Sequence, residues 1–172
     1  MSQSKALRLE DPSENYSRAA DRATSAVVGA WKLVSIEDCK SNGEVVRWMG
    51  ANPTGLIIYD ASGYMSVQFM RDPRPVFASA YNLATPDEVK NAYEGYFAYF
   101  GTYEVDESNA VIIHHLQGSL RPQEVGIEYR RYFEIDGDLL ILTMAVPGKD
   151  AGRKRTLVWK RSSAVTSGDV NS

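Results

Sequence analysis

A series of short β-rich runs separated by turn-forming residues is the feature that most constrains how this chain can fold. The runs begin near Val27, and their short spacing is typical of a meandering antiparallel sheet that closes into a sandwich or a barrel. We expect an all-β barrel, because nine candidate strands are enough to close one. The candidate strands are Ala30–Asp38, Glu44–Met49, Gly55–Asp60, Tyr64–Met70, Tyr99–Asp106, Ala110–Gln117, Glu128–Ile135, Asp138–Met144 and Arg155–Arg161.

The links between the runs favour an antiparallel up-and-down order, in which neighbouring strands pair. They include Ser41-Asn42-Gly43, Asp60-Ala61-Ser62-Gly63 and Asp136-Gly137. These residues tolerate the positive φ angles that tight hairpin turns require.

One segment departs from the strand pattern and predicts a helix. Thr85 is a candidate N-cap, Pro86 stands at the first helical position, and Glu88 completes a capping box. The predicted helix runs from Pro86 to Phe97, and its apolar side should pack on the barrel or cover one end. The connection before it, Arg71–Ala84, is either a lid or a plain surface connection.

Length and composition fit one domain with tails. A chain of 172 residues, 44% hydrophobic and 24% charged, is ordinary for one globular domain. We expect a polar N-terminal arm over 1–26, a barrel domain over 27–161 and a disordered tail over 162–172.

Charge and cysteine usage narrow the partners and the compartment. With 19 Lys+Arg against 22 Asp+Glu there is no basic field for nucleic acid or an anionic membrane, which leaves small molecules or proteins as partners. We expect a small-molecule ligand or substrate. The lone Cys39 cannot form an internal disulfide, and residues 1–26 lack the apolar stretch of a secretory signal. We expect a cytoplasmic protein that is a monomer or a homodimer.

Alternation along Glu128–Ile135 places one charged residue inside the barrel. Tyr129, Phe133 and Ile135 share a face with Arg131, and this apolar face should point inward. An unpaired buried guanidinium costs several kcal/mol, because it cannot shed its charge. Arg131 therefore meets a carboxylate, several carbonyl groups, water or an anionic ligand, and examples of an internal carboxylate are Glu37 and Glu104.

Two other strands supply candidates for an internal cavity. On Tyr99–Asp106, Tyr99 and Tyr103 share the face that should line the interior. On Tyr64–Met70 the apolar set that we place inward includes Met65 and Phe69. A hairpin bulge would reverse that choice and make Tyr64 and Gln68 the pocket residues, so these two remain second-rank candidates.

The adjacent histidines point to opposite faces of one strand, so at most one enters the barrel. With two histidines and one cysteine in the chain, the spacing of a metal site is absent, and we expect no metal. Periodicity does not separate the two faces. We take His115 as the inward residue, either a general acid or base or a hydrogen-bonded core histidine.

Several motifs together resemble a known family. Gly29-Ala30-Trp31 on the first barrel strand and Trp159-Lys160-Arg161 on the last resemble the lipocalin arrangement, in which the strand Trp packs under a basic side chain. Further segments are similar to the lipocalin-like domain family of bacteria and fungi over Val27–Arg161, namely Gly55-Leu56-Ile57-Ile58-Tyr59, Gly63-Tyr64-Met65-Ser66-Val67-Gln68, Tyr99-Phe100-Gly101-Thr102-Tyr103, His114-His115, Gly118-Ser119-Leu120 and Leu157-Val158-Trp159. The resemblance implies a lipocalin-like β-barrel with an internal cavity. It carries no agreed catalytic signature.

Three functions remain open from the sequence. The first is a module that binds a small, partly hydrophobic molecule, with walls that include Tyr99, Tyr129 and Trp159. The second, by analogy with related small barrels of natural-product pathways, is a cofactor-free isomerase, cyclase or dehydratase acting on a polyketide or terpenoid intermediate. There Arg131 and Tyr103 would stabilise an enolate or carboxylate while His115 or a carboxylate moves a proton. The third is a barrel filled by its own side chains. The absence of a Gly-rich phosphate loop disfavours a nucleotide, so no cofactor is expected.

Overall fold

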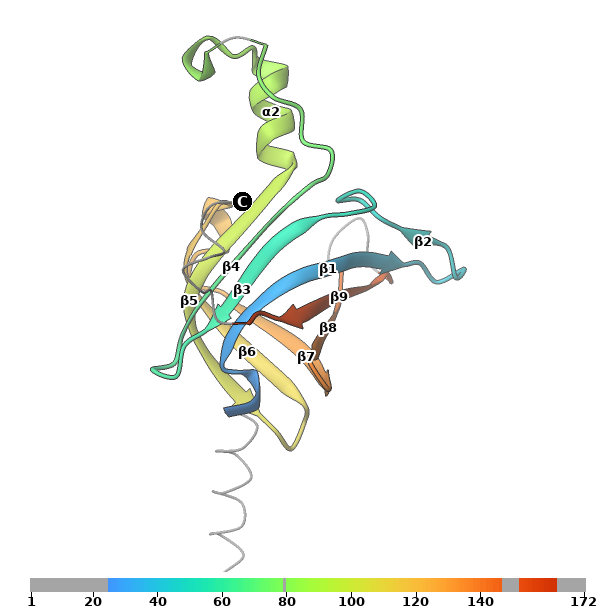
Figure 1. Cartoon of the computed structure of the whole chain (residues 1–172), viewed down its shortest axis with the longest axis vertical. Coiled ribbons are helices and arrows are strands. Elements are labelled where there is room, and N and C mark those ends of the chain that lie inside the picture. The colour runs from blue at the N-terminus through green and yellow to red at the C-terminus, as the bar shows by residue number, and fades with distance from the viewer. Residues whose placement is uncertain (1–24, 79, 147–151, 164–172) are drawn as a thin grey trace, which may run out of the picture.

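The computed structural model describes residues 25–78, 80–146 and 152–163, and eight antiparallel strands in it form a closed barrel (Figure 1). The strands pair in the order β1-β3-β4-β5-β6-β7-β8-β9, and pairing of β1 with β9 closes the barrel. A ninth strand, β2, pairs antiparallel with the last two residues of β1. The bounds are β1 Gly29–Cys39, β2 Val45–Val46, β3 Thr54–Tyr59, β4 Tyr64–Met70, β5 Tyr96–Asp106, β6 Val111–Ser119, β7 Glu128–Asp136, β8 Leu139–Ala145 and β9 Lys154–Arg161. The predicted up-and-down barrel is confirmed.

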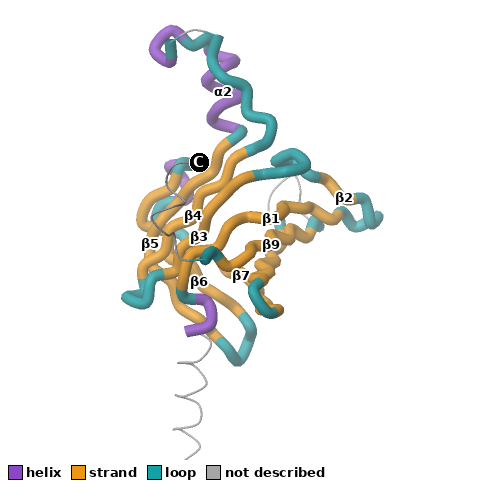
Figure 2. Tube along the Cα trace, viewed as in Figure 1, coloured by secondary structure: helices purple, strands orange, loops and turns teal. Residues whose placement is uncertain are grey.

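In the described ranges, helical segments are few and short (Figure 2). They include the 3-10 turns η1 (Tyr81–Leu83) and η2 (Pro122–Glu124) and the helix α2 (Pro86–Glu94). The predicted strand Glu44–Met49 shrinks to the two residues of β2. Most of the predicted arm and of the predicted tail lies outside the described residues.

The helix α2 begins as predicted but differs from the prediction in its end and in its packing. Thr85 caps it, with the reciprocal bonds of a capping box to Glu88. It ends at Glu94 because Tyr96 already pairs with Met70 of β4, which extends the sheet to the residue after Gly95. No residue of α2 is buried, and the helix stands away from the barrel as a continuation of β5 (Figure 1). The prediction that it packs on the barrel or covers one end is wrong.

A bulge in β1 changes which of its residues face the interior. The register between β1 and β9 shifts around Val34, which is half exposed. Trp31 faces the interior before this point, whereas Ile36 and Asp38 face it afterwards. Strict alternation from Trp31 would have put Asp38 on the outer face, so the bulge brings a carboxylate into the barrel.

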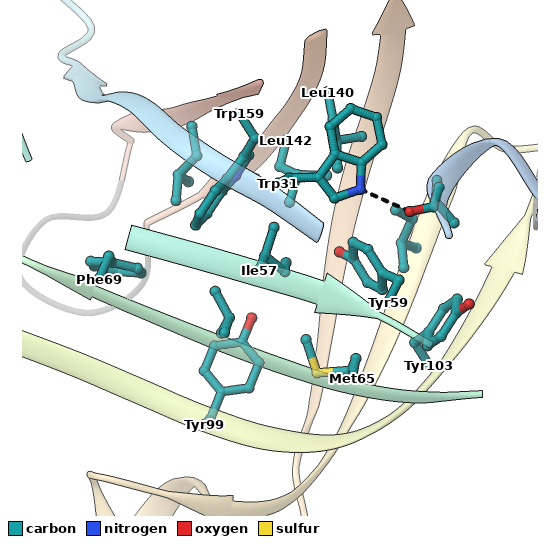
Figure 3. Close-up of a cluster of buried hydrophobic side chains, with 14 of the residues drawn as sticks. Trp31, Ile57, Tyr59, Met65, Phe69, Tyr99, Tyr103, Leu140, Leu142 and Trp159 are labelled. Atoms are coloured by element: carbon teal, nitrogen blue, oxygen red, sulfur yellow. Dashed lines mark hydrogen bonds between the residues drawn. The ribbon is translucent and has the colours of Figure 1, made fainter. Parts of the chain in front are cut away.

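Trp31 on β1 is buried under the basic side chain of Arg161, as the family resemblance implied. Its ring is fully buried, and Nε1 donates to the carbonyl oxygen of Val27 at 2.9 Å (Figure 3). The Arg161 guanidinium carbon lies 3.9 Å from the ring centroid, and its nitrogen donates to the Val28 carbonyl. The guanidinium therefore ties both ends of the barrel domain to this ring.

Candidate functional site

Two adjoining cavities occupy the barrel at the end away from Trp31. The outer cavity has a volume of about 380 Å³, and its walls include Trp48, Arg121 and Glu124. The inner cavity, of about 40 Å³, is lined by core residues that include Ile57 and Trp159. The two cavities share five wall residues, Phe69, Phe97, Arg131, Met144 and Arg155.

Three arginines in the cavity walls stack on aromatic rings. The pairs, with the distance from Cζ to the ring centroid, are Arg121–Phe97 at 4.6 Å, Arg131–Tyr129 at 4.3 Å and Arg155–Trp48 at 4.5 Å. Stacking of this kind orients the planar guanidinium and leaves its edge free to donate hydrogen bonds. The cavity therefore has aromatic walls with fixed positive groups.

Two of these arginines have carboxylate partners within the fold. Arg155 donates to both carboxylate oxygens of Asp38, at 2.6 and 2.8 Å, and Asp38 is only 1% exposed. Arg121 donates to Glu124 at 3.1 Å, and the Ser119 hydroxyl donates to the same carboxylate at 2.9 Å. Their charges are thus largely compensated by the protein.

Arg131 differs from both neighbours. Among residues 25–78, 80–146 and 152–163, no carboxylate lies within ion-pair distance of its guanidinium. Of the two carboxylates predicted as partners, Glu37 binds Arg47 outside the barrel, and Glu104 is 73% exposed beside His115. Arg131 is half-buried on the cavity wall, and its side chain reaches only the Arg130 carbonyl, at 3.4 Å, besides its contacts with Tyr129 and Tyr99.

The inward histidine is His114, so the prediction of His115 is wrong. His114 is fully buried, whereas His115 lies on the outer face between Glu104, at 3.4 Å, and Glu128, at 3.2 Å. Both faces of β6 are apolar, so periodicity could not separate them. The pairing decides, because His114 stands directly opposite the inward-facing Tyr103 of β5.

His114 is held between two tyrosine hydroxyls. Its Nε2 lies 2.8 Å from the Tyr59 hydroxyl and its Nδ1 lies 2.8 Å from the Tyr99 hydroxyl. Burial, together with the nearby Arg131 charge, holds the pKa of His114 well below its usual value, so the ring is neutral. A neutral imidazole has one N–H and one acceptor nitrogen.

Counting protons then assigns the tautomer. Tyr59, His114 and Tyr99 carry three protons for two hydrogen bonds, so one proton must point elsewhere. Tyr59 is fully buried, and its hydroxyl contacts no other polar group in the described part of the chain, so a free proton there would cost about 1–3 kcal/mol. Tyr99 lines the inner cavity. Tyr59 therefore donates to Nε2, Nδ1–H donates to Tyr99, and the Tyr99 proton points to the cavity.

Further donors in the walls lack a partner. Trp159 is fully buried and lines the inner cavity, and its Nε1–H has no hydrogen-bond partner in the described ranges. The same holds for Nε1–H of Trp48 in the outer cavity. Buried donors are normally paired, so donors left unpaired beside a cavity point to a group that enters it.

The sequence matches the model of one known protein family. The model of the lipocalin-like domain matches residues 28–162, more than three quarters of the sequence. The chain belongs to the lipocalin-like domain family. The resemblance derived from the sequence motifs is thereby confirmed, and a comparison with curated proteins finds no match. A lipocalin-like barrel with an internal cavity suggests binding of a small molecule.

The lipocalin-like barrel brings half of the predicted site residues to the two cavities. Tyr99 and Trp159 line the inner cavity, Tyr129 lines the outer one, and Phe69 and Arg131 line both. The structure thus gathers these five side chains, whose role toward a ligand stays a prediction.

Two predicted residues face the interior but line neither cavity. Met65 and Tyr103 belong to the packed part of the barrel, and the Tyr103 hydroxyl donates to the Asp60 carbonyl at 3.0 Å. Figure 3 shows Tyr103 and Tyr59 toward the end near Trp31, with Phe69 at the other end. Tyr103 is therefore satisfied by the turn between β3 and β4 and is not placed to contact a ligand in either cavity.

Tyr64 and Gln68 lie on the outer face of the barrel, so the reversal of β4 that would have made them residues of the internal pocket does not occur. Tyr64 is 59% exposed, and Gln68 accepts a hydrogen bond from the Tyr96 hydroxyl at 2.7 Å on the outer face. β4 pairs with β3 and β5 without a register shift, so the alternation is not reversed.

The sequence interpretation missed several wall residues. Phe97 was assigned to the helix, and Arg121 and Glu124 lie in the turn after β6, where no alternation exists. Arg155 was detectable, because it shares a face with Leu157 and Trp159. Asp38 was hidden by the bulge.

The described residues contain neither a cluster of metal ligands nor a membrane-spanning helix. No group of three or more His, Cys, Asp or Glu side chains within them could hold a metal ion. No helix among them is long and apolar enough to cross a membrane.

Proposed function

We propose that this lipocalin-like barrel binds a small, partly hydrophobic organic molecule in the two adjoining cavities. The observation that carries the proposal is the composition of the walls, in which aromatic and aliphatic side chains surround a few unpaired polar groups. An outer cavity of about 380 Å³ lies in the range of ligand sites. Its volume also speaks against a barrel filled by its own side chains.

The cofactor-free enzyme is supported less well. Neither His115 nor Tyr103, which would have carried the proton transfer and the stabilisation of an enolate, lines either cavity. Burial raises the pKa of Tyr99, with the Arg131 charge opposing that rise, so the hydroxyl stays protonated at neutral pH. Tyr99 is therefore suited to donate a hydrogen bond to a ligand and is a poor base. A cytoplasmic location and a monomeric or homodimeric state remain predictions.

Native mass spectrometry of the freshly purified full chain tests the proposal. We expect a retained small molecule, seen as a mass above that of the chain and lost on denaturation. Met144→Trp places a bulky ring in the wall that both cavities share and should reduce the retained fraction, whereas Ala61→Trp, in the exposed turn between β3 and β4, should not. A bare chain mass together with no binding of any hydrophobic probe would overturn the proposal.

A further inference from the structure

We propose that the ligand carries a carboxylate, which Tyr99 and Arg131 hold at the inner cavity while its apolar body occupies the outer cavity. This inference rests on the proposed function and specifies the chemistry of the ligand. It follows from four properties of the described walls, which are the lack of acceptors, the direction of the free protons, the uncompensated charge and the relative size of the cavities.

The inner cavity offers donors and no side-chain oxygen or nitrogen acceptor that is free. Its polar wall residues are Tyr99, Arg131, Arg155 and Trp159, and no carboxylate, amide or imidazole lines it in the described part of the chain. The Tyr99 oxygen already accepts from His114 Nδ1–H. A ligand group placed here therefore has to accept hydrogen bonds.

Two wall residues of this space, Tyr99 and Trp159, carry a proton without an acceptor among the described residues. The proton count of the Tyr59–His114–Tyr99 cluster leaves the Tyr99 O–H directed to the cavity. The Trp159 Nε1–H is fully buried and lacks a partner among the described residues. Together with the edge of the Arg131 guanidinium they offer several N–H and O–H donors to one group, which suits a group with two acceptor oxygens.

Charge separates a carboxylate from neutral acceptors. Arg155 and Arg121 are compensated by Asp38 and Glu124, whereas Arg131 has no carboxylate within reach in the described ranges. A carbonyl or hydroxyl would satisfy one donor and leave the charge uncompensated. A carboxylate accepts the hydrogen bonds and also compensates the positive charge of Arg131. An ammonium group would be repelled by that charge.

The two volumes fit a small head and a larger body. A cavity of about 40 Å³ holds roughly one group of the size of a water molecule or a carboxylate. The walls of the outer cavity, of about 380 Å³, include the aromatic rings of Trp48, Phe69 and Phe97 together with charged side chains such as the paired Arg121 and Glu124. The aromatic part of this wall accepts the apolar body. Because the two cavities share wall residues, one molecule can occupy both.

Calorimetric titration of the full chain with matched probes tests the inference. The first pair is 2-naphthoate and 2-naphthamide, which have nearly the same shape, and decanoate and decanamide repeat the comparison with a flexible body. We expect each carboxylate to bind roughly 10- to 100-fold tighter than its amide, as charge-assisted hydrogen bonds predict. Naphthylmethylammonium should bind more weakly than the amide.

Variants assign the preference to the two residues. Arg131→Leu should reduce the affinity for the carboxylates to that for the amides, and Tyr99→Phe should weaken carboxylate binding by roughly 5- to 10-fold. Arg131→Gln, which keeps a polar side chain, should also lose the preference and serves if the leucine variant does not fold. Arg74→Leu removes the same charge from the loop before α2, outside both cavities, and should leave the affinities unchanged.

The outcomes separate the two proposals. Equal affinity for carboxylate and amide, or a preference that survives in the folded Arg131 variants, would overturn the carboxylate inference and leave the proposed function standing. A retained native ligand without a carboxylate would do the same. If none of the probes binds and the purified chain retains nothing, both proposals fail.

Discussion

The buried pair of Asp38 and Arg155 should be the strongest single electrostatic contact in this barrel. We expect Arg155→Met to lower the free energy of unfolding by about 3–5 kcal/mol, because it leaves the Asp38 carboxylate, 1% exposed, without its partner. The loss of the stacking contact with Trp48 adds about 0.5–1 kcal/mol.

The two partners should not contribute equally. Asp38→Leu leaves the Arg155 guanidinium unpaired, but this side chain is 23% exposed and lines the outer cavity, where water solvates it. We therefore expect a smaller loss for Asp38→Leu, about 1–3 kcal/mol. The double variant replaces the pair by apolar side chains and should lie within about 1 kcal/mol of the natural protein.

Urea unfolding of the four proteins measures the coupling. We expect a coupling energy of about 3 kcal/mol or more, with a lowering of the thermal midpoint by roughly 6–20 °C for Arg155→Met. The exposed pair Arg47–Glu37 provides the control, since Arg47→Met should cost no more than about 1 kcal/mol. A coupling energy below about 0.5 kcal/mol would refute the reasoning, because it would make the buried pair no stronger than the exposed one.

Three other perturbations have defined outcomes. Trp31→Ala should lower the free energy of unfolding by about 3–5 kcal/mol, since it removes a fully buried ring, and an unchanged melting temperature would contradict this. His114 has a folded-state pKa well below 6.5, so it stabilises the fold above pH 6.5, and this contribution is lost progressively as the pH falls below about 6.5. His114→Gln should flatten this part of the pH profile of urea unfolding, and an unchanged profile would contradict the assignment. Arg131→Leu should leave the free energy of unfolding unchanged or raise it, whereas a loss of about 3–5 kcal/mol in urea unfolding would reveal a stranded carboxylate.

Alternation predicted the interior well where the strands are regular and one face is clearly apolar. On β4 the apolar face holds Met65 and Phe69, the register has no shift, and both residues are buried. On β7 the same rule placed Arg131 on the inward face, where it lines both cavities. Local pattern was sufficient there because each step along the strand exchanges the two faces.

The pattern failed where tertiary contacts decide the facing. The bulge at Val34 reverses β1 without any residue that marks it in the sequence, so Asp38 could not be foreseen. β6 is apolar on both faces, and only its pairing with β5 distinguishes His114 from His115. Phe97 fits a helical pattern as well as a strand, and its pairing with Phe69 of β4 settles it.

The contrast between Arg155 and Arg131 is the main support for the proposal that the barrel interior binds a ligand. Both guanidiniums keep their charge, line both cavities and stack on an aromatic ring. Asp38 already compensates Arg155, so that arginine is part of the fold. Arg131 has no carboxylate partner among the described residues, and the Tyr99 hydroxyl proton and the Trp159 N–H have no acceptor there. Leaving these donors unpaired costs stability in the empty protein. A molecule that supplies the missing acceptor recovers this free energy on binding. The free energy of unfolding then rises by RT ln(1 + [L]/Kd), where [L] is the free ligand concentration and Kd its dissociation constant.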